Sequence, residues 1–126
     1  MSLSHPIARA RGLGSAKNGT HHWWVQRLTA VALALLSPWF IITAVGLLSA
    51  DHAAVQAVLA QPLNATLMMA FVISLFWHVR LGLQVVVEDY IHIHWLEVSL
   101  QVAILFACVL ASLASLIAIA RIAIAG

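Results

Sequence analysis

The most informative segment of the sequence is Leu75-Phe-Trp-His-Val-Arg-Leu-Gly-Leu-Gln-Val-Val-Val-Glu-Asp-Tyr90. Its apolar residues predict a helix. At about 100° per residue, Gly82 lies about 40° from His78 and Asp89 about 20° from it. One stripe of this helix therefore carries a histidine, a glycine one turn on and a carboxylate at its end, with Tyr90 beside it. An ionisable ring inside an apolar helix is rare and points to a function.

The composition indicates an integral membrane protein. Of 126 residues, 63% are hydrophobic and 8% charged, and the mean hydropathy is +1.02, whereas soluble domains average about 25% charged residues. The net charge of +2 is too small and too scattered for nucleic-acid binding. A single cysteine, Cys108, excludes a disulfide framework.

Three apolar runs predict an all-α membrane protein. Each exceeds the roughly 20 residues that a helix needs to cross the hydrocarbon core. The expected spans cover residues 28–49, 63–87 and 96–124. We expect a polar, basic segment over residues 1–27, and a three-helix membrane anchor over residues 28–126. Between the spans, the sequence predicts a loop over residues 51–62 and a turn over residues 88–95.

The distribution of basic residues predicts how the chain is oriented in the membrane. Four of the six Lys and Arg residues precede the first span, and neither connecting segment carries one. Because Lys and Arg favour the cytoplasmic side, we expect the N-terminus in the cytoplasm and, after three crossings, the C-terminus outside. The Asp89-Tyr90 pair and Arg27 then lie at the same, cytoplasmic face.

His78 is the first candidate for chemistry, because it lies nine residues before Val87 and thus about 14 Å inside the membrane. One interpretation is a hydrogen bond that joins two membrane helices. The other is an axial ligand to haem iron, for which neutral imidazole is suited. Gly82, one turn on, would let a porphyrin or a helix approach closely. The remaining histidines lie at or beyond the span ends, so a partner subunit or a second copy would supply the other ligand.

Arg27, Asp89 and Tyr90 are candidates at the cytoplasmic interface. Arg27 is either a positively charged membrane anchor or a partner for an anionic cofactor group, since guanidinium binds carboxylates in a bidentate manner. A phenol such as Tyr90 can donate to a quinone carbonyl, and a carboxylate such as Asp89 can orient a donor or deliver protons. Interfacial tyrosines and acids at helix ends are also common, so the spacing leaves both interpretations open.

Together these motifs resemble a known family. The elements are His78-x-x-x-Gly82, Asp89-Tyr90, Asn18-Gly19-x-His21 and Arg27-x-Thr29-Ala30. They resemble the small hydrophobic membrane-anchor subunits of succinate dehydrogenase, in the alphaproteobacterial and mitochondrial branch.

The resemblance implies a role for each site residue. His78 matches the family's axial ligand to haem b, with the opposite ligand from a companion cytochrome b anchor subunit. Tyr90 matches the residue that hydrogen bonds ubiquinone, and Asp89 is its neighbour in that site. Arg27 matches an arginine near the haem propionates and the quinone pocket.

The resemblance also implies an assembly and a location. The partners would be the companion anchor, an iron–sulfur subunit and a flavoprotein subunit, which pass electrons from succinate to ubiquinone. This chain would perform no succinate chemistry itself. The expected location is the bacterial inner membrane, or alternatively the mitochondrial inner membrane. Two other functions stay open: the anchor of a related fumarate reductase, and a haem-free membrane scaffold or transporter subunit.

Overall fold

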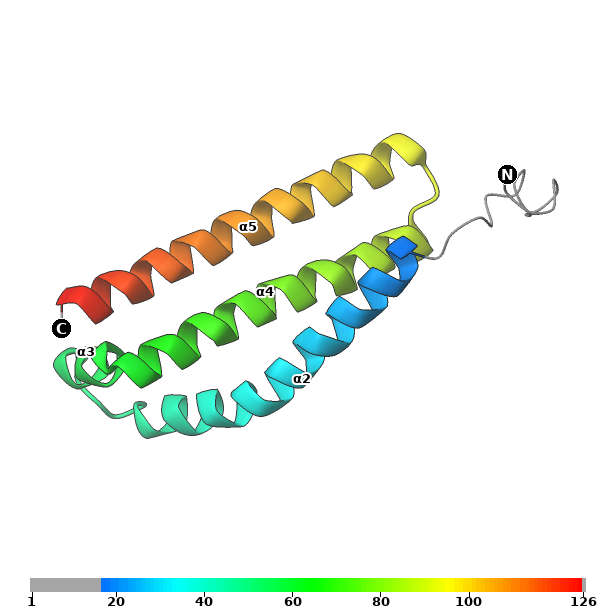
Figure 1. Ribbon diagram of the computed structural model, residues 1–126. Coiled ribbons are helices and arrows are strands. Elements are labelled where there is room, and N and C mark those ends of the chain that lie inside the picture. The colour runs from blue at the N-terminus through cyan, green and yellow to red at the C-terminus, as the bar shows by residue number, and fades with distance from the viewer. Residues whose placement is uncertain (1–16, 126) are drawn as a thin grey trace, which may run out of the picture.

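The computed structural model describes residues 17–125, with side chains from Thr20 onward, and this part of the chain is helical with short connections (Figure 1). The helices are α2 (Lys17–Gly46), α3 (His52–Ala60), α4 (Pro62–Tyr90) and α5 (His94–Ala125). Residues 1–16, which make up more than half of the predicted polar segment 1–27, lie outside the described residues. The division of the chain at residue 27 thus stays a prediction.

The predicted all-α membrane fold is confirmed. Residues 20–46, α4 and α5 are each long and apolar enough to cross a membrane. The predicted spans, which were delimited by the apolar runs, miss the helix ends: α4 and α5 extend beyond both ends of their spans, whereas α2 begins before residue 28 and ends at Gly46, short of the predicted end at residue 49. At its ends, a helix continues into polar residues such as His22, Gln26 and Glu88, because they tolerate the helical backbone at the membrane surface.

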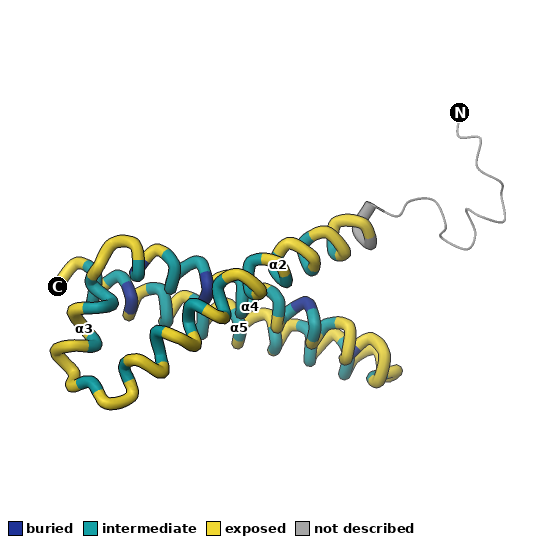
Figure 2. Tube along the Cα trace, turned by 90° about the horizontal axis from the view of Figure 1, so that it is seen from below, coloured by how far each residue is buried: buried dark blue, intermediate teal, exposed yellow. Residues whose placement is uncertain are grey.

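The three long helices run antiparallel to their neighbours, with α4 between α2 and α5 (Figure 1). The start of α2, the end of α4 and the start of α5 therefore lie at the same end of the molecule. Seen at 90° to that view, the start of α2 diverges from the other two helices (Figure 2). The predicted placement of Arg27 and Asp89-Tyr90 at one end agrees with this topology.

Two predicted connections are wrong in detail. The loop expected over residues 51–62 contains α3, whose N-cap Asp51 accepts a hydrogen bond of 2.9 Å from the backbone amide of Ala54. Alanine and leucine favour the helix once it is capped. The turn expected over residues 88–95 is shorter, since α4 continues to Tyr90 and α5 begins at His94.

The contacts between the long helices are mostly apolar. Ala65, Val72 and Ile119 form the buried cluster between α4 and α5. Phe40 of α2 stacks on Phe71 of α4, with 4.5 Å between the ring centroids. These contacts fix the positions of the helices, and with them the faces that α4 presents to α2 and α5.

Candidate functional site

His78 lies near the middle of α4. The middle residue of this 29-residue helix is Phe76, so His78 is about 3 Å further along the axis. Its side chain is half-buried and points to α2, where its Nδ1 lies 3.0 Å from Oγ1 of Thr29. The structure thus brings together two polar side chains that are 49 positions apart.

This contact contributes little to the stability of the bundle. Hydrogen bonds between membrane helices are worth about 0.6 kcal/mol on average. A large ring fixed at one nitrogen, however, loses most of its rotational freedom. The contact therefore matters more for the orientation of the ring than for the association of α2 with α4.

The surface of α4 beside His78 is open at Gly82. A methyl group added at Gly82 would meet nothing within 4 Å in the described structure. The close approach predicted for this glycine is therefore not made by another helix of the described chain. The space is free for a group from outside, such as a partner helix or the edge of a flat cofactor.

Asp89 and Tyr90 form the last turn of α4, where both side chains are exposed. Tyr90 keeps 77% of its surface accessible. Neither side chain hydrogen bonds to another within the described residues, whereas the neighbouring Glu88 accepts a hydrogen bond of 3.0 Å from Gln84. A carboxylate and a phenol are therefore free side by side at this end of the molecule.

Arg27 lies on α2 at the same end of the bundle. It is exposed, and its guanidinium carbon lies 5.5 Å from the centre of the Trp23 ring. A cation over an indole face is attracted to the ring, so this contact orients the Arg27 side chain toward Trp23 on the same helix. Within the described residues it makes no ion pair with Asp89, and the structure does not join these two side chains directly.

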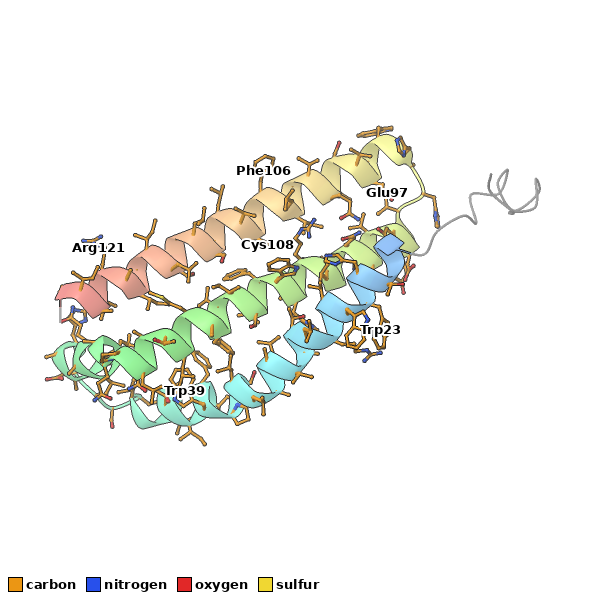
Figure 3. The ribbon with its side chains drawn as sticks, viewed as in Figure 1. Trp23, Trp39, Glu97, Phe106, Cys108 and Arg121 are labelled. Carbon is orange, nitrogen blue, oxygen red and sulfur yellow. The ribbon has the colours of Figure 1, made fainter. Side chains whose placement is uncertain are left out.

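Arg80 faces the opposite neighbour from His78. Together with Trp77 of α4 and Cys108 of α5, it lines a pocket of about 330 Å³, and Figure 3 shows Cys108 on the side of α5 that faces α4. This agrees with the angle of about 200° between Arg80 and His78 on a helix. Arg80 and His78 do not share a site.

Three polar residues on α2 were not predicted as site residues. Besides Thr29, these are His22 and Gln26, whose Nε2 and Oε1 atoms are buried without a hydrogen-bond partner in the described chain. The three positions have the spacing i, i+4, i+7, which places them on one face of the helix. That spacing of polar residues at the start of an apolar span is the signal that could have revealed them.

The potential metal-ligating side chains of the described residues do not gather into one group. In residues 17–125 there is no group of three or more His, Cys, Asp or Glu side chains that could hold a metal ion. His78 is one half-buried imidazole with open space one turn away. The described residues therefore complete no such group around His78.

Comparisons with known proteins identify the family of this chain. Residues 1–119 match the family model of the succinate dehydrogenase/fumarate reductase transmembrane subunit. The succinate dehydrogenase hydrophobic membrane anchor subunit of Rickettsia bellii is 35% identical over 113 residues, which are 90% of this chain and 90% of the relative. The subunit of the same name from Paracoccus denitrificans is 34% identical over 85 residues, 68% of this chain and 66% of the relative.

A third relative extends the comparison. The succinate dehydrogenase membrane anchor subunit of Reclinomonas americana is 34% identical over 79 residues, 60% of this chain and 66% of the relative. The family match covers all of α2, α3 and α4 and most of α5. With its three apolar helices, the chain thus belongs to the family of succinate dehydrogenase and fumarate reductase transmembrane subunits.

Proposed function

We propose that this chain is the hydrophobic membrane anchor of a succinate:ubiquinone oxidoreductase. It would hold the flavoprotein and iron–sulfur subunits at the membrane and, together with a companion cytochrome b anchor, form the site where electrons reach ubiquinone. The family match and the names of the relatives support this proposal. The chain itself would carry out no succinate chemistry.

In this proposal His78 would hold the iron of haem b, and the companion subunit would supply a second ligand. The observation that carries it is the half-buried imidazole near the middle of α4, with open space at Gly82 on the same stripe. His78 is half-buried rather than fully buried, which supports access to part of its ring from outside. A bound haem b would supply one-electron transfer, and His78 would hold it near the middle of the membrane.

The proposed ubiquinone site lies at the end of α4. The hydroxyl of Tyr90 would donate a hydrogen bond to a quinone carbonyl, and the Asp89 carboxylate would orient the head group or pass protons to it. Both side chains are exposed and free of other described partners, which supports this role. Arg27, at the same end, would supply positive charge to a haem propionate or to the quinone pocket.

The proposed orientation places this end at the cytoplasm. The N-terminal side of the chain carries most of its Lys and Arg residues, which favours its retention there. The C-terminus of α5 would lie outside. The bacterial inner membrane is the proposed location, and the mitochondrial inner membrane is the alternative.

The first test is a reduced-minus-oxidised visible spectrum of membranes that contain the whole complex. We expect a b-type α-band with the unaltered chain and its loss with His78→Leu. His52→Leu is the matched control, because His52 is an exposed histidine of α3 and should leave the band unchanged. A band that persists in His78→Leu would exclude His78 as the ligand, and no band in any sample would favour a haem-free anchor.

An anchor of a fumarate reductase is the second candidate, because the matching family includes both enzymes. The same membranes distinguish the two enzymes by the direction in which electron transfer is faster. A succinate dehydrogenase complex should reduce ubiquinone with succinate faster than it oxidises a low-potential quinol with fumarate, and the reverse ratio would favour the second candidate.

A further inference from the structure

The contact between Thr29 and His78 joins the proposed haem ligand to a neighbouring helix. Oγ1 of Thr29 lies 3.0 Å from Nδ1 of His78, and both residues are half-buried in membrane-spanning helices. Either atom could be the donor, because a hydroxyl and an imidazole nitrogen can each give or accept a hydrogen bond. The direction of this bond decides which ring nitrogen carries the proton.

The surroundings of the hydroxyl settle the direction. Oγ1 of Thr29 lies 2.9 Å from the carbonyl oxygen of Val25 and 3.0 Å from that of Gln26. Carbonyl oxygens only accept. If the hydroxyl gave its single proton to His78, its lone pairs would face both carbonyl oxygens at close range, which is repulsive. The favourable arrangement directs the proton to the carbonyls and a lone pair to the ring.

It follows that His78 donates through Nδ1–H and keeps its lone pair on Nε2. We propose that Thr29 is a positioning residue that fixes the tautomer and the orientation of His78, so that Nε2 is presented as the iron ligand. This inference rests on the proposed role of His78 in binding haem. Hydrogen bonding of the second ring nitrogen is a general means of orienting metal-bound histidines and of raising their basicity.

The membrane makes the hydrogen bond between Thr29 and His78 harder to replace than it would be in water. In the hydrocarbon region no water replaces a lost partner, so without the Thr29 hydroxyl the Nδ1–H would lose the hydrogen-bond partner that it has in the described structure. The neutral ring could then change tautomer or rotate. Because the hydroxyl is bonded to its own helix at the same time, its position is fixed by the backbone of α2 rather than by a flexible side chain.

The experiment uses the whole membrane complex with three altered chains. Thr29→Val removes the hydroxyl at nearly constant shape, and Thr29→Ser keeps it. Thr66→Val is the matched control, since Thr66 donates to the carbonyl oxygen of Pro62 on its own helix at 2.7 Å but has no histidine partner. For each complex we would measure haem content, the g values of the oxidised haem, its midpoint potential and the rate of haem transfer to apomyoglobin.

We expect haem transfer from Thr29→Val to be about tenfold faster, in line with the usual effect of removing such a partner. Its midpoint potential should rise, because a less basic imidazole stabilises the oxidised iron less. Its g values should shift, and Thr29→Ser should restore all three properties. Thr66→Val should match the unaltered complex.

Two outcomes separate the failure of this inference from that of the proposed function. If His78→Leu abolishes the haem band while Thr29→Val leaves the potential, the g values and the transfer rate unchanged, the positioning role is wrong and the ligand role stands. If the band survives in His78→Leu, both fail. Should Thr29→Val not assemble, Thr29→Ala removes the same hydroxyl, and its comparison with Thr29→Ser decides in the same way.

Discussion

At the scale of single residues, the two proposed sites lie one after the other along one face of α4. His78 and Asp89 are 11 residues apart, which separates them by about 16 Å along the helix. An electron carrier near the middle of the membrane and a quinone site at its surface would be held by the same rigid element. Their spacing would then be fixed by the helix backbone and not by loops.

Tyr90→Phe tests the surface site, since it removes one hydroxyl and keeps the ring. A hydrogen bond is worth about 1 kcal/mol, so we expect ubiquinone reduction by succinate to slow about fivefold. Oxidation of succinate with an artificial dye, which bypasses the quinone, should keep its rate. Trp95→Phe is a suitable control, because Trp95 is an exposed aromatic residue at the start of α5. Unchanged quinone kinetics in Tyr90→Phe would remove this residue from the site.

The sequence predicts which residues share a face, but not what that face meets. The helical spacing alone relates His78 to Gly82 and Asp89. It does not reveal that Thr29 lies against His78, because that contact depends on how α2 and α4 are aligned along their lengths. Thr29 stands in the motif with Arg27, yet its partner becomes visible only when the helices are placed.

At the scale of helices, the apolar runs predict the number and order of the spans and miss their ends. Hydrophobicity marks the part of a helix that lies in lipid. The start of α2 and the last turn of α4 are polar, and their backbone is helical nonetheless. The short α3 was missed for a related reason: nine residues are too few for a span, and its helix depends on a cap.

Asp51→Ala tests that dependence. Loss of an N-cap costs about 1 kcal/mol of helix stability, so amide hydrogen exchange in residues 52–60 should become about fivefold faster. Asp51→Asn keeps a side-chain acceptor and is nearly as good a cap, so it should exchange at the original rate. Equal exchange in all three proteins would show that contacts of α3 with α4 and α5 stabilise it, rather than the cap.

At the scale of the whole molecule, the described chain buries few of its side chains. Its buried core comprises six apolar residues and no polar ones. Large side chains project outward from the long helices, among them Phe106, which Figure 3 shows pointing away from α4 and which is 61% exposed. A single layer of three helices has no interior that could surround a haem. Lipid covers some of these faces, and the proposed companion anchor would cover the one that bears His78.

Expression with and without the companion anchor tests this requirement. Alone in membranes, the chain should contain no haem, because the described residues offer a single imidazole at the depth of His78 and no enclosing wall. With the companion present, the b-type spectrum should appear, and His78→Leu in that pair should abolish it. A haem-loaded monomer would contradict the shared site. A haem-loaded pair of identical chains would contradict the need for the companion anchor. It would agree with the need for two imidazoles at this depth, because His78 of the second copy would replace the companion's ligand.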